Sequence, residues 1–426
     1  MSGSLSISIA KNISNRKTFR PRYAYFSNIY HKQKLLDQVI LIVMPNPKSF
    51  TGEDVVEISC HGNPIVVQQI IDACIEQGAR IARPGEFTRR ALENGKLSLL
   101  QAEALNGLIH ARTVEGIDLV HKNMQGELDQ GVSELKEQLL DICAELEAIL
   151  DHPDDDLSMM KDEEICALLH KIANISHQSA QNWKSNRIGI QGAKVALIGS
   201  VNAGKSSLFN HLVGFDRAIV SNIPGTTRDV VEKTVQLDGM EICFFDTAGA
   251  RIQTEDAIES KGIEMGLSAA KDVDLCLVVF SLQEWMSNRK EVEEQIEELI
   301  FHVSPVPTLT IGTHQDLVHA NPDVDVILSN YDKKGVDELQ KKILSFLREK
   351  PSRADAYTVV SQRQYDLFLS IAKHCRQASE ALMGIYGPAV AVEEVIFALE
   401  KISELTGEEV RERVLDRLFS KFCIGK

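Results

Sequence analysis

A glycine-rich segment near the middle of the chain has residue types and spacing suited to binding phosphate. From Gly199 to Ser206 it follows the pattern G-x-x-x-x-G-K-[ST]. The glycines let the backbone wrap an anion, so that consecutive N–H groups and the start of the next helix face it. Lys205 would reach the β- and γ-phosphates of a nucleotide, and the Ser206 hydroxyl would bind Mg²⁺. The residues that we expect at the nucleotide here are Asn202, Ala203, Gly204, Lys205, Ser206 and Ser207.

The flanking residues predict the elements that would hold this loop. The apolar run before it, 194–198, is typical of a buried parallel strand, and residues 207–213 after it start a helix. A strand, a glycine loop and a helix in this order distinguish a phosphate loop from a chance match in a glycine turn. Because strands and helices alternate from about 191 to 348, we expect a doubly wound α/β domain.

Two motifs downstream indicate which nucleotide is bound. An apolar strand ends in D-T-A-G, where Asp246 would hold Mg²⁺ through a water molecule and the Gly249 N–H would meet the γ-phosphate. Between this strand and the phosphate loop, Thr227 is expected to complete the Mg²⁺ shell. The order of the three motifs resembles that of translation-factor-like GTPases and favours GTP. The other nucleotide contacts expected from these motifs are Ser221, Asn222, Ile223, Pro224, Gly225, Thr226, Thr247 and Ala248.

The segment expected to recognise the base departs from the usual form, N-K-x-D. After the apolar run 308–312, Thr313 replaces the asparagine and His314 replaces the lysine that covers the base. Asp316 can still accept hydrogen bonds from guanine N1 and N2. We therefore expect a preference for guanine, whose strength these residues leave open. The last guanine contact, usually S-A-K or S-A-R, is expected at 329–331 and also departs.

Composition limits the remaining possibilities. A chain of 426 residues predicts two or three domains, and no apolar run approaches the roughly 18 residues of a membrane-spanning helix. Eight single cysteines and the absence of a signal-peptide pattern predict a cytoplasmic protein with no membrane partner. The net charge of −15 argues against broad nonspecific nucleic-acid binding. A local basic patch, or simply a solvated surface, could form from Arg16, Lys17, Arg20, Arg22, Arg83, Arg89, Arg90 and Lys96.

The rest of the chain predicts an α+β module followed by a helical region. Before residue 97 we expect strands at 39–44, 55–60 and 79–82 and a helix over 65–74. A stripe of apolar residues spaced three and four apart, from 132 to 149, predicts a long helix, and a second helix follows. The acidic run 151–156 between them could bind a metal, but a solvated turn that caps the next helix explains it better.

Helical patterning returns after residue 355, where five apolar residues from 367 to 382 share one face. We infer that the α/β domain is inserted into a helical domain whose two halves pack together. The predicted boundaries are 1–97 for the N-terminal α+β domain, 98–190 and 351–426 for the helical domain, and 191–350 for the nucleotide-binding domain.

The last five residues, Phe-Cys-Ile-Gly-Lys, complete a set of motifs that resembles one family. With N-x-G-K-S-S, G-T-T-R-D, D-T-A-G and the segments 49–54, 83–88 and 96–104, this tail is similar to the MnmE (TrmE) family of tRNA modification GTPases. The resemblance covers nearly the whole chain. It implies a tetrahydrofolate-binding N-terminal domain and a helical domain with an inserted Ras-like P-loop G domain.

The resemblance also implies partners. The protein would form a homodimer through its N-terminal domains and act with the flavoprotein MnmG (GidA). Together they would modify C5 of the wobble uridine, position 34, in certain tRNAs by adding an aminomethyl or carboxymethylaminomethyl group. A 5-formyl- or methylene-tetrahydrofolate-type cofactor would supply one carbon.

Roles for individual residues follow from the same resemblance. No catalytic glutamine follows the D-T-A-G motif, and Glu259 matches the family's water-orienting glutamate, although by itself it is most simply a helix-surface residue. Cys423 matches the family's functional C-terminal cysteine. The family's K⁺ ion, which replaces the charge of an arginine finger when two G domains pair, would be held by Asn202, Ser221, Ile223 and Thr226. The folate-contacting positions would be Glu57, Lys96 and Lys426.

One departure and two rival functions stay open. The family's first strand and a folate-contacting arginine have no counterpart before Met1-Ser2-Gly3, so we expect either a start farther upstream or an incomplete folate pocket. The main rival to a tRNA-modifying enzyme is a regulatory GTPase of ribosome assembly that binds RNA without modifying it. A degenerate partner of MnmG that hydrolyses GTP poorly is a third possibility. The C-terminal motif and the N-terminal module favour the enzyme.

Overall fold

The computed structural model describes most of the chain, in two compact units. The described residues are 1–151, 160–200, 202–214, 231–246, 273–318, 322–329, 333–348, 356–408, 412–420 and 422. The first unit comprises 1–106, 123–174 and 366–426, and the second comprises 107–122 and 175–365. None of the helices within these ranges combines the length and the apolar content needed to cross a membrane.

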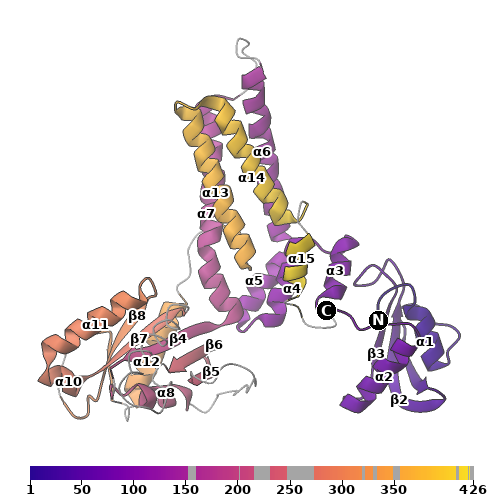
Figure 1. Ribbon diagram of the computed structural model, residues 1–426, viewed down its shortest axis with the longest axis horizontal. Helices are drawn as coiled ribbons and strands as arrows, with labels where there is room; N and C mark the ends of the chain where they lie inside the picture. The colour runs from indigo at the N-terminus through magenta and orange to yellow at the C-terminus, as the bar shows by residue number, and fades with distance from the viewer. Residues whose placement is uncertain are drawn as a thin grey trace. The chain divides into compact units, whose positions relative to one another are not determined.

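The N-terminal part of the first unit is a three-stranded antiparallel sheet covered on one face by two helices (Figure 1). Side chains alternate along the strands, so Ile29, Leu41 and Val56 pack on Ile13 and Ile70 of the helices. The sheet order is β1-β2-β3, with β1 Ala24–His31, β2 Lys34–Met44, β3 Val55–Ser59, α1 Ser6–Ser14 and α2 Pro64–Glu76.

The other face of this sheet, called the open face here, consists of Ala24, Phe26 and Asn28 of β1, Gln38, Ile40 and Ile42 of β2, and Glu57 and Ser59 of β3. Phe26 pairs directly with Ile40, and these side chains are 69% and 48% exposed. The strand predicted at 39–44 is confirmed within β2. Its side chains alternate between the core and the open face, although a continuous apolar run is typical of a strand buried on both faces. The predicted strand at 79–82 is wrong, because these residues form no ladder and lead directly into the next helix.

Helices make up the remainder of the first unit. The stripe from Val132 to Leu146 is buried, and its helix α6 packs along α14. Cys166 Sγ of α7 donates to the Ser379 carbonyl of α13 over 3.7 Å, so segments far apart in sequence pack together, as predicted. The helices outside the α/β domain are α3 Glu86–Glu93, α4 Leu99–His110, α5 Val114–Met124, α6 Glu127–Asp151, α7 Asp162–Gln191, α13 Gln362–Met383, α14 Gly387–Thr406 and α15 Glu412–Phe419. Most of α5 and the C-terminal part of α7 belong to the second unit.

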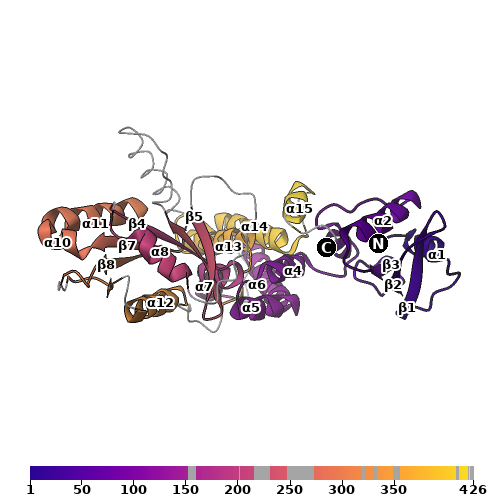
Figure 2. The ribbon, with the colours of Figure 1, turned by 90° about the horizontal axis from the view of Figure 1, so that it is seen from below.

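The second unit contains the predicted α/β domain, a six-stranded sheet with helices on both faces (Figure 2). The strand order is β5-β6-β4-β7-β8-β9, and only β5 runs antiparallel to its neighbour. Helices α8 and α12 pack on one face and α11 on the other. Because the other strands are parallel, their carboxyl ends meet at one edge, where α/β domains bind ligands.

The elements of this domain are β4 Ala193–Gly199, α8 Lys205–Val213, β5 Val231–Leu237, β6 Met240–Asp246, β7 Leu275–Ser281, α10 Leu282–Ser287, α11 Arg289–Val303, β8 Thr308–Thr313, β9 Val326–Ile327 and α12 Lys333–Leu347. Strand β5 has no counterpart in our sequence prediction.

Candidate nucleotide-binding site

The phosphate loop lies between the end of β4 and the start of α8, as the motif predicts. A Cβ at Gly199 would lie 1.9 Å from the Val279 carbonyl oxygen, so only glycine fits this close to β7. Asn202 and Gly204 have left-handed backbones, with φ of +64° and +85°. Gly204 is the N-cap of α8, so the first N–H groups of that helix face the loop.

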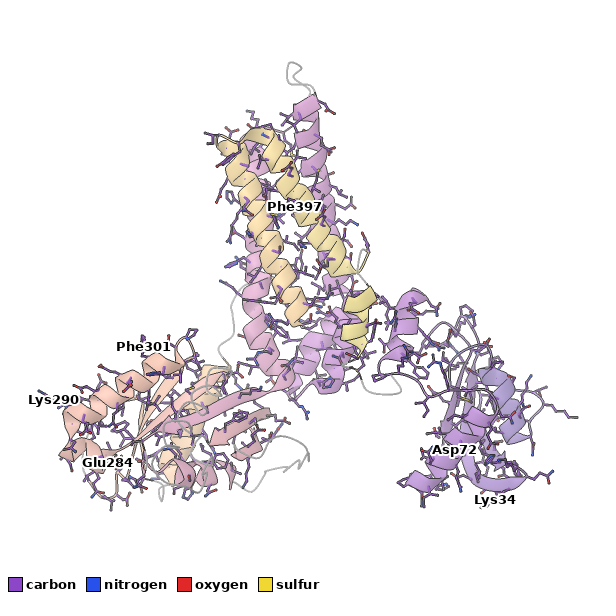
Figure 3. The ribbon with its side chains drawn as sticks, in the orientation of Figure 1. Lys34, Asp72, Glu284, Lys290, Phe301 and Phe397 are labelled. Carbon is purple, nitrogen blue, oxygen red and sulfur yellow. The ribbon has the colours of Figure 1, made fainter. Side chains whose placement is uncertain are left out.

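Lys205 and Ser206 occupy the first turn of α8. The Lys205 side chain is 7% exposed, and its Nζ donates to the carbonyls of Gly199 at 2.8 Å and Ser200 at 2.5 Å. The Ser200 hydroxyl lies 3.5 Å from the carboxylate of Glu284, labelled on α10 in Figure 3. Ser206 and Ser207 are exposed. A hydroxyl at an exposed helix N-terminus suits Mg²⁺, which prefers oxygen ligands.

Several predicted contacts lie outside the described residues. The backbone of Asp246 ends β6 and pairs with Leu197 of β4, which puts it at the same sheet edge as the phosphate loop. The Asp246 side chain, residues 221–227, residues 247–249 and Glu259 lie outside the described set. Residues 152–156 of the acidic run also lie outside it.

The base-recognition segment follows β8 and is tied to the phosphate loop through Thr313. Its hydroxyl lies 2.8 Å from the Ala203 carbonyl oxygen and 3.1 Å from that of Phe280. His314 has φ of +62°, and its Nδ1 lies 3.2 Å from the hydroxyls of both Thr313 and Ser281. Asp316 is exposed. Of the last predicted guanine contact, 329–331, only residue 329 is described.

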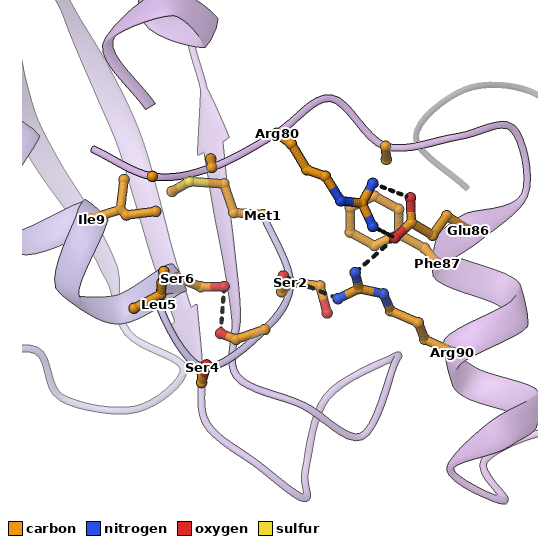
Figure 4. Close-up of a pocket in the computed structure, with 14 residues that line it drawn as sticks. Met1, Ser2, Ser4, Leu5, Ser6, Ile9, Arg80, Glu86, Phe87 and Arg90 are labelled. Carbon is orange, nitrogen blue, oxygen red and sulfur yellow. Dashed lines mark hydrogen bonds and ion pairs between the residues drawn. The ribbon is translucent and has the colours of Figure 1, made fainter. Parts of the chain in front are cut away.

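A second polar cluster, in the first unit, links motifs at 49–54 and 83–88. Arg90 pairs with Glu53 at 2.8 Å. Figure 4 shows the other two pairs, Arg90 with Glu86 at 2.7 Å and Arg80 with Glu86 at 2.5 Å. The Arg80 hydrogen bonds lower the pKa of Glu86 to about 2, and the Arg83 backbone N–H and Arg90 assist. Because carboxylates already partner them, Arg80 and Arg90 do not make a free basic patch. A pocket of about 250 Å³ adjoins the cluster.

The C-terminal helix packs directly on this region of the first unit. A Cβ at Gly85 would lie 2.7 Å from the Phe419 carbonyl oxygen and 3.0 Å from the Cβ atoms of Phe419 and Phe422. Arg89 pairs with Asp416 at 2.6 Å. The absence of a side chain at Gly85, in the R-P-G-E-F-T motif, thus lets the C-terminal segment pack against this loop. Residues 423–426, including the predicted Cys423 and Lys426, lie outside the described residues.

The two described folate candidates are exposed and do not line the pocket. Glu57 is on the open face, opposite Ile42. The Lys96 side chain lies beside Gly52, where an added Cβ would be 3.1 Å from Lys96 Cε. The Asn94 side-chain amide donates to the Thr51 carbonyl at 2.7 Å, which joins the two loops.

The described cysteines are mainly packing residues. Burial raises the pKa of the Cys276 thiol in β7 to about 12, and that of the Cys375 thiol in α13 to about 12. Within the described ranges, no group of three or more His, Cys, Asp or Glu side chains is arranged to hold a metal ion.

Sequence reasoning missed an ion pair that fastens the end of α7 to the G-domain sheet. Arg187 pairs with Asp274, whose side chain is fully buried. The other carboxylate oxygen accepts from the Lys194 backbone N–H at 2.9 Å. An aspartate directly before the apolar run of β7 is the only signal that could have indicated it.

Comparisons with known proteins identify the family. The family described as "MnmE helical domain" matches residues 99–423, and "GTP-binding protein TrmE N-terminus" matches residues 1–96. A relative named "tRNA modification GTPase MnmE" from Nostoc sp. is 35% identical, covering 100% of this chain and 95% of that protein. One of the same name from Pseudothermotoga lettingae gives the same three values.

A solved G domain of the T. maritima FeoB iron transporter is 25% identical over 36% of this chain and 98% of that chain, with a TM-score of 0.25. The matches by family and by relatives extend over the whole sequence. The chain belongs to the MnmE (TrmE) family of tRNA modification GTPases.

Proposed function

We propose that this chain hydrolyses GTP and uses hydrolysis to drive the modification of tRNA. The observation that carries the proposal is the phosphate loop. The backbone of Gly199 packs against the Val279 carbonyl, and Gly204 is the N-cap of α8. Lys205 Nζ donates to the carbonyls of Gly199 and Ser200. Relatives named tRNA modification GTPase MnmE that match the full length support both the nucleotide and the substrate.

In this proposal each side chain around the phosphate loop has a separate role in GTP hydrolysis. Lys205 would bind the β- and γ-phosphates, and Ser206, Thr227 and Asp246 would hold Mg²⁺, which would supply positive charge against the phosphates. Glu259 would orient the attacking water. The K⁺ ligands would be Asn202, Ser221, Ile223 and Thr226, and the exposed Asn202 supports this assignment.

The modification chemistry would use the first unit. We propose that Glu57, Lys96 and Lys426 bind a tetrahydrofolate-type cofactor, which supplies one carbon to C5 of the wobble uridine. Both described candidates, Glu57 and Lys96, are exposed, so their charges are accessible to a ligand. Phe422 packs on Gly85 at the start of α3. We propose a functional role in the modification reaction for Cys423, the next residue in the sequence.

The partners in this proposal are a second copy of the chain and MnmG. The open face supports a homodimer, because an isolated sheet face with an apolar cross-strand pair gains by being covered. Phe26 and Ile40 provide that pair, and Glu57 lies on the same face. MnmG would supply the flavin for the joint reaction on tRNA.

GTP hydrolysis by the full-length protein, in K⁺ and in Na⁺ at equal ionic strength, tests the proposal. We expect at least tenfold faster hydrolysis in K⁺, lost in Asn202→Ala and kept in Asn210→Ala. Asn210 is an exposed control on α8, outside the loop. Equal slow rates in both salts would remove the K⁺ site and favour a regulatory GTPase or a degenerate partner of MnmG.

A further inference from the structure

The hydroxyl of Thr313 has a single proton, and main-chain carbonyls compete for it. The hydroxyl lies 2.8 Å from the Ala203 oxygen and 3.1 Å from the Phe280 oxygen, and Nδ1 of His314 lies 3.2 Å from it. A threonine hydroxyl donates one hydrogen bond, whereas an asparagine amide donates two. The Thr313 side chain is also completely buried by protein atoms. Its only donor is therefore committed to the backbone.

We propose that Thr313 is a positioning residue that fastens the base-recognition segment to the phosphate loop, and that its side chain donates no hydrogen bond to the N7 atom of the guanine base. The inference rests on the proposed function, because it assumes GTP at the phosphate loop with its base at Asp316. It goes further by assigning the Thr313 hydroxyl to the backbone of the protein and not to the N7 edge of the base.

Selectivity for guanine survives this loss, for a chemical reason. N7 is an acceptor in both guanine and adenine, so a donor to N7 adds affinity without distinguishing the two bases. Guanine alone offers N–H donors at N1 and N2 to a carboxylate, which is acceptor-only when ionised. Asp316 is exposed at the end of the segment and can supply that carboxylate.

The bond from Thr313 to Ala203 explains why a threonine can serve at this position. Ala203 stands between the two left-handed residues of the phosphate loop, Asn202 and Gly204, and is itself fully buried. Its carbonyl accepts a hydrogen bond from a residue 110 positions away. A buried carbonyl without a donor is costly, so the hydroxyl stabilises the phosphate loop and the base segment together.

The first test compares the affinities of the wild-type, full-length protein for GDP and 7-deaza-GDP, in which a C–H replaces N7. We expect dissociation constants within twofold of each other, because a hydrogen bond to N7 would make 7-deaza-GDP roughly two- to tenfold weaker. A larger difference that Thr313→Val abolishes overturns the proposal, whereas one that Thr313→Val leaves unchanged comes from a donor other than Thr313.

The second test uses Thr313→Val, which keeps the shape without the hydroxyl, and Thr313→Ser, which keeps the hydroxyl. We expect Thr313→Val to lower the affinities for GDP and for 7-deaza-GDP by the same factor. Thr313→Ser should bind both nucleotides with the affinity of the wild type. If Thr313 contacted N7, Thr313→Val would weaken GDP alone, which would overturn the proposal.

A third variant, Asp316→Asn, tests separately whether the guanine base lies at Asp316, as the proposed function requires. Asp316→Asn should lose affinity for GDP and gain affinity for xanthosine diphosphate, whose base carries a carbonyl in place of the 2-amino group. If Asp316→Asn changes neither affinity, the base does not lie at Asp316 and the proposed site is wrong, whatever the 7-deaza result.

Discussion

Replacing Gly85 by alanine should detach the C-terminal segment from the first unit. Gly85 has φ of +66°, which costs a residue with a Cβ about 1–2 kcal/mol. The added Cβ would also lie 2.7 Å from the Phe419 carbonyl oxygen and 3.0 Å from two phenylalanine Cβ atoms. These are backbone or backbone-adjacent atoms, so the end of α15 must move as a whole.

The size of the effect follows from what that movement exposes. Phe419 and Phe422 are 3% and 4% exposed, and each buried phenylalanine contributes about 1.5–3 kcal/mol. Loss of both would cost up to about 3–6 kcal/mol. Gly95→Ala is the matched control: its φ of +62° imposes the same backbone strain, but no heavy atom outside its chain neighbours lies within 4 Å of the added Cβ.

Hydrogen–deuterium exchange of the peptide spanning 412–422, read by mass spectrometry in the full-length protein, measures the opening of this segment. A local loss of about 3 kcal/mol corresponds to exchange roughly a hundredfold faster. We expect this for Gly85→Ala and not for Gly95→Ala, with exchange in β7 of the second unit unchanged in both. Equal exchange of the C-terminal peptide in the two variants would refute the argument that contact, and not backbone strain, requires glycine at position 85.

Three further changes test other contacts. Glu86→Gln should destabilise the protein by at most about 3 kcal/mol, because folding lowers the pKa of the Glu86 carboxyl from 4.5 to about 2. The stabilisation by the ionised carboxylate is complete above pH 4.5 and is lost as the pH falls towards 2. Urea-denaturation curves of the wild type and the variant should therefore converge in acid. Arg187→Met, which leaves a buried carboxylate unpaired, should cost about 2–4 kcal/mol in urea unfolding followed by tryptophan fluorescence; Arg348→Met, from an exposed pair, should cost under about 1 kcal/mol, and similar losses would contradict the role of burial. Phe26→Asp should convert a dimer to a monomer in analytical ultracentrifugation, whereas Phe301→Asp, at an exposed side chain of α11, should not; an unchanged mass for Phe26→Asp would exclude the open face as the interface.

The sequence predicted most reliably the strands that are buried on both faces of the sheet. Strand β4, which was predicted from the apolar run 194–198, is buried along nearly its whole length, as central parallel strands are. Its continuous apolar run gave a strong signal. Strand β5 is an antiparallel edge strand in which apolar and polar residues mix, and no signal identified it. The error at 79–82 has a different cause, because Arg80 bonds forward to Glu86 and commits that stretch to the approach to α3.

In the candidate site, the parts formed by one continuous stretch of sequence were predictable, and the contacts between distant stretches were not. A motif contained in one stretch of sequence, such as Gly199 to Ser206, predicted its own strand, loop and helix. Contacts between distant stretches were beyond prediction, because their partners are chosen by the fold. The Thr313–Ala203 bond spans 110 positions, and the Arg89–Asp416 pair spans 327.

Burial of the Cys276 and Cys375 thiols gives the native chain two internal reporters of unfolding. Burial raises the pKa of both thiols and covers both side chains, so alkylating reagents react slowly with either residue while the protein is folded. Cys276 belongs to the second compact unit and Cys375 to the first. The order in which the two become alkylated during denaturation would show which unit opens first, without any engineered label.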